Sequence, residues 1–331
     1  SLSGKIENLI LVIFIPLAIL YIFYVPLVWN YPLEQNLADA RYTISDYKTA
    51  KFAPKIDFWL LSHEITRPVG QYLHGFLMVA QRTAGGNSAY FLGEVSNKGW
   101  THYFPILFIT KEQIGLYALI ILAVFIFLKK LSETPLQKIS IKTTIFLSFV
   151  AYYWVWSLWS PLNIGVRHIL PTFPFVYILI SKPIIEWADS NIKKIIMSIL
   201  FLVMAIEIIF VFPFFLSYYN EFAGGWKNGY KIATDSNYDW GQDLKRLKTW
   251  TQKNNIDKIY LDYFCGGSPE YYLGSEYEFW RHENGVPPSG SYFAISANSL
   301  IGAEDLYYWL KGKKPVARAG SSIFIYQISN N

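Results

Sequence analysis

Three aspartates and several other polar side chains are packed into the ten-residue stretch DSNYDWGQDL, which runs from Asp235 to Leu244. Asp235, Asp239 and Asp243 are spaced by four, so a helix would bring them onto one face. Carboxylates aligned in this way could hold a divalent cation or supply a general acid or base. Because the dense acidic spacing of a calcium-binding loop is absent, we expect no metal here.

The same stretch also has the composition of a helix start. Ser236 or Asn237 can cap a helix predicted over Tyr238–Lys253, with Asp239 in its first turn. A cap does not need the Trp and Gln that follow, so we expect substrate contact as a second role beside the structural one. The candidate contact residues of the stretch are Asp235, Asn237, Asp239, Trp240, Gln242 and Asp243.

Arg167 and His168 lie at the start of a second polar motif, GVRHILPTFPF, where Pro171 and Pro174 break an apolar run. Charge within a membrane is costly, and such residues usually serve a function. A guanidinium binds two phosphate oxygens at once. The pair therefore predicts a binding site for a lipid phosphate. The alternative is that both side chains extend into the headgroup layer without a ligand.

A third motif, GEVSNKGWTHYFP, combines aromatic rings with polar side chains. Indole and phenol rings suit the faces of sugars, while carboxylates and amides bind sugar hydroxyls. We expect sugar or substrate contact from Glu94, Lys98, Trp100 and Tyr103. The alternative is an interfacial belt of aromatic residues that anchors this segment at the membrane surface.

Most of the segments that must position these motifs are long apolar runs. The chain is 53% hydrophobic and only 16% charged, whereas soluble domains carry about 25% charged residues. Five runs approach or reach the length of about 20 residues that crosses a bilayer. They are Leu9–Trp29, Gln113–Leu128, Thr143–Trp159, Ile164–Ser181 and Ile195–Leu216. The runs predict an α-helical multispan membrane protein with about five spans, rather than five buried core helices.

Lysines in the short links predict the orientation of these spans. The links Lys129–Lys142 and Lys182–Lys194 are rich in lysine, and positive loops stay in the cytoplasm. The two links are separated by two spans, so the two assignments agree. We therefore expect the loop 30–112 and everything after Leu216 on the outer side of the plasma membrane. Apolar spacing around Tyr72 and Phe76 predicts a helix within that loop.

The C-terminal part has the pattern of a small α/β domain outside the cytoplasm. Strands are predicted over Lys258–Phe264, Tyr292–Ala297 and Ser322–Ile328, and helices over Tyr238–Lys253, Ser268–Leu273 and Glu304–Leu310. Alternating strands and helices favour a partly parallel sheet. The predicted division is a membrane domain over 1–216, with its outer loop 30–112, and an extracytoplasmic α/β domain over 217–331.

Charge and cysteine content exclude several classes of function. The net charge of +5 comes from the apolar part, because acids and bases balance after Leu216, and we expect no nucleic-acid partner. The single Cys265 excludes an intrachain disulfide. P-loop, dinucleotide and His/Cys metal motifs are absent from the sequence, and no cofactor is expected. The chain starts at Ser1 without a signal peptide, and we expect a piece of a longer protein.

Three segments together carry a family resemblance: GEVSNKGWTHYFP, GVRHILPTFPF and YYNEFAGGWKNGYKIATDSNYDWGQDLKRL. They resemble the C-terminal half of bacterial and archaeal membrane glycosyltransferases of glycosyltransferase family 39, the protein O-mannosyltransferase and aminoarabinose-transferase-like group with the GT-C fold. The resemblance covers roughly Arg67 to Leu247. It implies an enzyme that moves a sugar from a polyprenyl-phosphate donor to a glycan or protein acceptor outside the cytoplasm. It also implies that Arg167 and His168 match the pair near the lipid phosphate.

Members of that family use an acidic residue from an early outer loop as the catalytic base, and no residue of this chain matches it. The loop NYPLEQNLADARYTISDYK, after the first run, is similar to a later loop of the family. We therefore expect the base upstream of this chain and a C-terminal portion that is inactive alone. The alternative is a membrane-anchored module that binds a glycan or a partner without chemistry. A transporter is disfavoured, because no internal repeat is evident.

Overall fold

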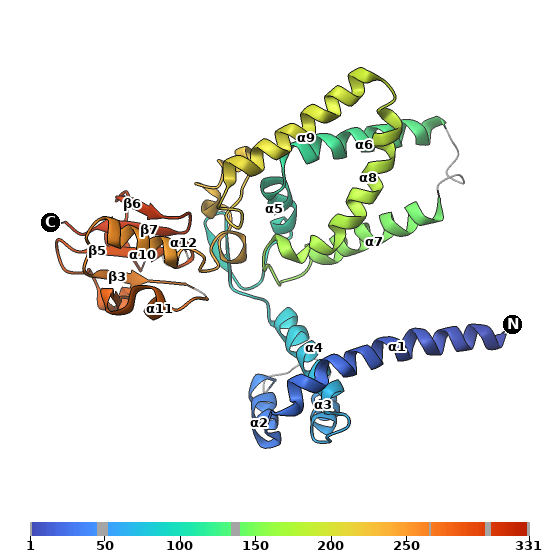
Figure 1. Cartoon of the computed structure of the whole chain (residues 1–331), viewed down its shortest axis with the longest axis horizontal. Coiled ribbons are helices and arrows are strands. Elements are labelled where there is room, and N and C mark those ends of the chain that lie inside the picture. Colours follow the sequence, from blue (N-terminus) through green and yellow to red (C-terminus); the bar gives the residue numbers. More distant parts are fainter. Residues whose placement is uncertain (1, 45–51, 134–139, 265, 302–305, 330–331) are drawn as a thin grey trace. The chain divides into compact units, whose positions relative to one another are not determined.

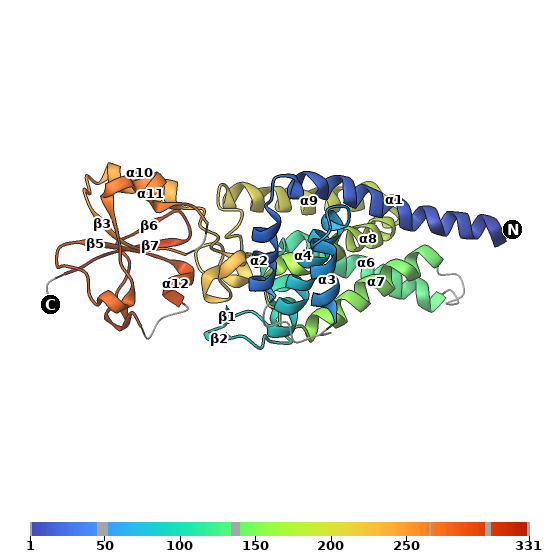
Figure 2. The same cartoon turned by 90° about the horizontal axis from the view of Figure 1, so that it is seen from below.

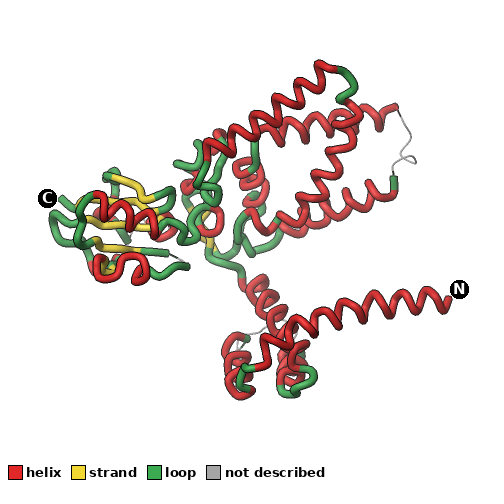
Figure 3. The backbone as a smooth tube through the Cα atoms, viewed as in Figure 1, coloured by secondary structure: helices red, strands yellow, loops and turns green. Residues whose placement is uncertain are grey.

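The computed structural model describes residues 2–44, 52–133, 140–264, 266–301 and 306–329. The described chain is mostly helical and carries a small sheet near its C-terminus (Figure 3). It divides into two compact units, Ser1–Asn87 and Ser88–Asn331. The boundary between these units falls inside the predicted outer loop 30–112.

The first unit consists of the helices α1 (Leu2–Trp29), α2 (Leu33–Thr43), α3 (Ala53–Leu61) and α4 (Arg67–Gly85) (Figure 1). α4 packs against both α1 and α3, and it confirms the helix predicted around Tyr72. A Cβ atom at Gly70 would lie 2.9 Å from the backbone nitrogen of Leu61. Glycine at this position therefore allows α4 to approach α3 closely.

The second unit begins with a hairpin, β1 (Ala89–Phe91) and β2 (Glu94–Ser96), and continues with α5 (Tyr103–Lys111). Four longer helices follow, namely α6 (Ile114–Glu133), α7 (Ile141–Leu158), α8 (Phe173–Trp187) and α9 (Asn191–Val211) (Figure 1). α6 packs on α8 and α9, and α7 packs on α8. Large apolar side chains such as Phe125, Ile145 and Phe210 remain exposed on these helices, which is typical of a surface that contacts lipid or protein.

Three helical segments of the described chain are long and apolar enough to cross a membrane, namely Leu11–Trp29 within α1, α6 and α9. The sequence predicts two further spans, of which the first corresponds to α7. The second, predicted over Ile164–Ser181, is an α-helix only from Phe173, and it continues to Trp187. Residues 164–172 contain 3-10 turns instead. Pro174 lies in the first turn of α8, where its missing N–H leaves no hydrogen bond unmade.

A five-stranded sheet organises the C-terminal part of the second unit, with the strand order β4-β3-β5-β7-β6. The strands are β3 (Ile259–Asp262), β4 (Tyr277–Phe279), β5 (Tyr292–Ser296), β6 (Ala317–Ala319) and β7 (Ile323–Gln327). β3 pairs in parallel with β4 and β5, whereas β7 pairs antiparallel with β5 and β6. The predicted partly parallel sheet is confirmed, while β4 and β6 are strands that the sequence pattern does not predict.

The two faces of the sheet pack against different parts of the unit. α10 (Leu244–Lys253) and α11 (Pro269–Leu273) cover one face with leucine side chains. α12 (Ala297–Ile301) lies on the opposite side (Figure 2). On that side Phe293 and Phe324 join a larger aromatic core that also contains Tyr103 and Tyr238. The sheet therefore packs against the segment that leads into DSNYDWGQDL, where the Tyr230 ring lies 5.0 Å from that of Phe324 and the Tyr238 hydroxyl donates to the carbonyl oxygen of Ser321.

Two of the helices predicted for this region differ in the structure. The helix predicted over Tyr238–Lys253 begins only at Leu244, because Gly241 has a φ of +79° and leaves the helical conformation. Of the helix predicted over Glu304–Leu310, the described part contains a 3-10 turn, Tyr308–Leu310, and positions 304–305 lie outside the described residues. The short helix predicted from Ser268 is confirmed as α11.

Candidate functional site

Asn237 joins the three polar motifs into one buried assembly. Its side-chain amide donates a hydrogen bond to Tyr103 Oη at 2.9 Å, and its Oδ1 accepts one from the backbone N–H of Val166 at 3.0 Å. Asn237 is fully buried. The predicted cap is therefore wrong: this amide binds α5 and the segment before Arg167, and it does not cap α10.

The GVRH segment fits closely against its neighbours because of a glycine. Gly165 has a φ of +98°, and a Cβ atom there would lie 2.6 Å from Ser236 Oγ. That hydroxyl donates to the carbonyl oxygen of Ile164 at 2.6 Å. Two residues earlier, Asn163 Oδ1 accepts from the backbone N–H of Trp100 at 2.8 Å. The backbone next to Arg167 is thus held from both sides.

Arg167 and Trp240 come together at the surface of this assembly. The guanidinium carbon of Arg167 lies 5.1 Å from the centre of the Trp240 ring, a cation–π distance. Its Nε donates to the carbonyl oxygen of Ile164 at 3.0 Å, and the side chain is exposed. No ion pair of Arg167 is found within the described ranges, so its terminal N–H groups are available to an anion.

His168 makes contacts of a different kind. Its ring stacks on Phe104 with the ring centres 5.0 Å apart and the planes 23° apart. Its carbonyl oxygen accepts a hydrogen bond from Tyr153 Oη at 2.8 Å, which ties α7 to the turn before α8. These contacts attach the residue next to Arg167 to both α5 and α7.

The remaining predicted sugar contacts lie in the hairpin β1–β2, in the segment after it and at the start of α5. Leu92 and Gly93 both have positive φ values, 50° and 97°, as a two-residue type I′ turn requires. Glu94 Oε2 accepts a hydrogen bond from Trp100 Nε1 at 3.3 Å. The Trp100 ring lies nearly parallel to that of Tyr103, with centres 6.4 Å apart. Lys98 is exposed, and no ion pair involving it is found in the described part of the chain.

Asp243 and Gln242 serve the packing of the C-terminal domain. Asp243 Oδ2 accepts hydrogen bonds from the backbone N–H groups of Ser321 and Ser322, each at 2.9 Å, and Oδ1 pairs with Arg246 at 2.5 Å. Gln242 donates to Ser217 Oγ at 3.3 Å and to the carbonyl oxygen of Tyr238 at 3.0 Å. Because these bonds occupy both side chains, neither Asp243 nor Gln242 is available to bind a ligand.

The other two aspartates also depart from a helical alignment. Asp239 is fully buried, and its carboxylate accepts from the backbone N–H groups of Gly241 and Asn298, each at 3.3 Å. Burial raises the pKa of Asp239 to about 6. Asp235 has a φ of 54° in a 3-10 turn, and its backbone N–H donates to Asn298 Oδ1 at 3.1 Å. Among the described residues, no group of three or more His, Cys, Asp or Glu is placed to hold a metal ion.

Lys111 is a site residue that sequence reasoning misses. Its Nζ donates to the carbonyl oxygens of Leu216, at 3.1 Å, and of Asn237, and it lies 4.5 Å from the centre of the Tyr219 ring. Burial lowers the pKa of Lys111 to about 7 and raises that of Glu112 to about 7. The sequence signal that could have identified this residue is the adjacent pair of Lys111 and Glu112 at the end of the apolar segment of α5.

The first unit has a buried polar chain of its own that the sequence pattern also does not reveal. Asp57 Oδ2 lies 2.8 Å from His74 Nδ1, and His74 Nε2 lies 2.8 Å from Thr43 Oγ1. The Thr43 hydroxyl donates to the carbonyl oxygen of Asp39 at 2.8 Å. Because its own proton is directed to the backbone, the Thr43 hydroxyl accepts a hydrogen bond from His74 Nε2. The chain of hydrogen bonds therefore connects α2, α3 and α4.

Comparisons with protein-family models, with curated proteins and with solved structures found no match for this chain.

Proposed function

We propose that this chain is the C-terminal portion of a membrane glycosyltransferase that uses a sugar carried on polyprenyl phosphate. The observation that carries the proposal is the pair of Arg167 and Trp240. An exposed guanidinium without an ion partner in the described residues stacks on an exposed indole, shortly before the start of the apolar helix α8. A guanidinium suits a phosphate, and an indole face suits a sugar ring.

The surrounding residues support a donor that bridges lipid and water. Lys98 adds a second exposed cation, and Trp100 adds a second indole whose N–H is directed to Glu94. In this proposal, α1, α6, α7, α8 and α9 span the plasma membrane, and the sheet lies outside the cytoplasm. The phosphate is bound at the outer interface, and the catalytic base is supplied by residues upstream of Ser1.

A binding module without catalysis is the second candidate. It is favoured by the structural use of the buried carboxylates, since Asp239 and Asp243 are both occupied by hydrogen bonds within the protein. Such a module would hold a phosphate-linked glycan at the same Arg167–Trp240 pair. The complete protein separates the two candidates: an enzyme releases polyprenyl phosphate from its sugar-loaded form, whereas a module retains the loaded lipid unchanged.

The phosphate role is tested by lipid binding to the full chain in phosphatidylcholine nanodiscs. Polyprenyl phosphate and uncharged polyprenol of the same length are titrated in parallel. We expect Arg167→Ala to weaken binding of the phosphate form about 10- to 100-fold, because hydrogen bonds to a charged group contribute roughly 1.5–3 kcal/mol. Binding of polyprenol is expected to stay the same.

Arg281→Ala is the matched control for this experiment. Arg281 is also an exposed arginine over an aromatic ring, with its guanidinium carbon 5.2 Å from the centre of the Phe279 ring, and it lies after β4, in the sheet region. Its removal should leave both affinities unchanged. Equal binding of polyprenyl phosphate by wild type and Arg167→Ala would remove the basis of the proposal.

A further inference from the structure

A cavity of about 470 Å³ lies between α6, α7 and α8, apart from the Arg167 site. α6 and α7 each pack on α8, and the cavity occupies the space between their ends. Its walls are mostly apolar and include Phe127, Phe146 and Leu179. The lining residues of α8 run from Ile178, near the middle of that helix, to Glu186 near its end, whereas Arg167 precedes its first turn.

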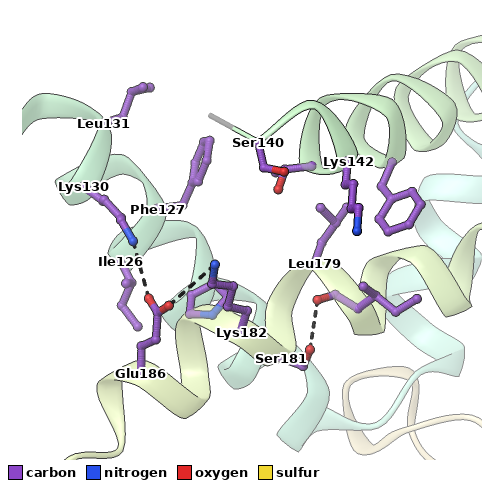
Figure 4. Close-up of a pocket in the computed structure, with 14 residues that line it drawn as sticks. Ile126, Phe127, Lys130, Leu131, Ser140, Lys142, Leu179, Ser181, Lys182 and Glu186 are labelled. Carbon is purple, nitrogen blue, oxygen red and sulfur yellow. Dashed lines mark hydrogen bonds and ion pairs between the residues drawn. The ribbon is translucent and has the colours of Figure 1, made fainter. Parts of the chain in front are cut away.

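Three lysines and one glutamate line this cavity. Glu186 lies between Lys130 and Lys182, with N–O distances of 3.5 Å and 3.8 Å, and Lys142 lies across from them on α7 (Figure 4). No ion pair of Lys142 is found in the described ranges. Three positive charges against one negative charge leave an excess of two at the mouth of an apolar cavity. An occupant that matches both features is an anionic amphiphile.

We infer that this cavity binds an anionic phospholipid, with its phosphate at the lysines and part of an acyl chain against the apolar wall. Basic pockets between membrane helices bind anionic headgroups, and α6 is itself long and apolar enough to span a bilayer. The charged end of the cavity is distinct from the proposed donor site, because the distance along α8 from its first residue, Phe173, to Glu186 is about 20 Å at 1.5 Å per residue. The lipid would hold the ends of α6 and α7 together through α8.

The test measures lipid retention by the full chain in neutral detergent. Phosphatidylglycerol and phosphatidylcholine are titrated separately, and bound lipid is counted by native mass spectrometry. We expect phosphatidylglycerol to bind more tightly, and Lys142→Ala to weaken it about 5-fold, the factor that corresponds to roughly 1 kcal/mol for a lysine near an anionic headgroup. Lys129→Ala is the matched control, because Lys129 neighbours Lys130 on α6 but does not line the cavity; it should change the affinity less than 2-fold.

Glu186→Gln gives a prediction of opposite sign. Removing the only acidic side chain among the described lining residues should tighten phosphatidylglycerol binding about 5-fold, a gain that a misfolded variant would not produce. Inorganic phosphate serves as a competitor and should not displace the lipid at millimolar concentration.

Three results would overturn the inference. The first is equal retention of the two phospholipids, and the second is an equal effect of Lys142→Ala and Lys129→Ala. Displacement of phosphatidylglycerol by inorganic phosphate is the third, since it would mean that the lysines bind a free anion.

Discussion

Asp239 shows how a carboxylate in a promising motif can be fully occupied by the backbone. Two N–H groups, from Gly241 and Asn298, hold it in a fully buried position. Burial still disfavours its charge, which is why the pKa of Asp239 is raised. The ionised form of Asp239 therefore lowers the free energy of unfolding, so the stability of the fold depends on pH through this residue.

We predict that stability declines as pH rises from about 4 to above 6, and that Asp239→Asn removes part of this decline. The pKa of Asp239 rises from 3.8 to about 6 on folding, so the folded state binds the proton more tightly and loses free energy relative to the unfolded state as pH passes through that window. A shift of two pKa units corresponds to about 3 kcal/mol at most. Thermal unfolding in detergent between pH 4 and pH 7 measures both proteins; an unchanged slope in the variant would contradict the prediction.

Arg167 and Trp240 were both identifiable as candidate site residues from their chemistry, but their contact with each other was not predictable from the sequence. Each was a candidate from its chemistry, one for phosphate and one for sugar, on motifs more than seventy positions apart. Their contact depends on Asn237, whose hydrogen bonds to Tyr103 and Val166 connect distant segments. No local pattern predicts such a bond, because an amide side chain can pair with any backbone or hydroxyl group that tertiary packing brings near.

At the scale of elements, long patterns were predictable and short ones were not. The alternating burial of β3 and the nearly continuous apolar runs of β5 and β7 identify strands, since a half-buried strand alternates and a fully buried strand is apolar throughout. β4 and β6 have three residues each, too few for a period to be recognised. The predicted start of α10 is too early. Gly241 and Asp239 contact Tyr263 and Asn298 instead of continuing the helix, and helix propensity does not account for such tertiary contacts.

Gly165→Ala should damage both stability and donor binding. The residue has a positive φ, and a methyl group would lie 2.6 Å from Ser236 Oγ and 3.0 Å from Asn237 Oδ1. A non-glycine residue in such strained backbone costs about 1–3 kcal/mol, and the shift would move Arg167 as well. We expect a lower unfolding temperature together with weaker binding of polyprenyl phosphate in nanodiscs.

Gly75→Ala is the control for that substitution. Gly75 lies within α4, where a Cβ atom would meet no atom within 4 Å, and alanine favours a helix over glycine by about 1 kcal/mol. This variant should be slightly stabilised and should bind the lipid as wild type does. If Gly165→Ala behaved like Gly75→Ala, the close fit around Gly165 would not matter for the site.

For the whole molecule, the distribution of lysines predicts the side of the membrane on which each part lies. In a Cys265→Ser background, a cysteine at Asn97, an exposed position directly after β2, should react with a membrane-impermeant maleimide in intact cells. A cysteine at Ser132, in the lysine-rich link Lys129–Lys142, should react only after permeabilisation. Labelling of Ser132→Cys in intact cells would reverse the proposed orientation.

The hydrogen bonds of Asn237 also determine when the Arg167 site can form. They join positions 71 and 134 residues apart, so the site is incomplete until synthesis has passed Asn237. At about 5–20 residues per second, Arg167 emerges from the ribosome roughly 4 to 14 seconds before its supporting residues. During that interval Arg167 lacks both the backbone support of Asn237 and the ring of Trp240, so the site forms only after their synthesis, not while the GVRH segment is being made.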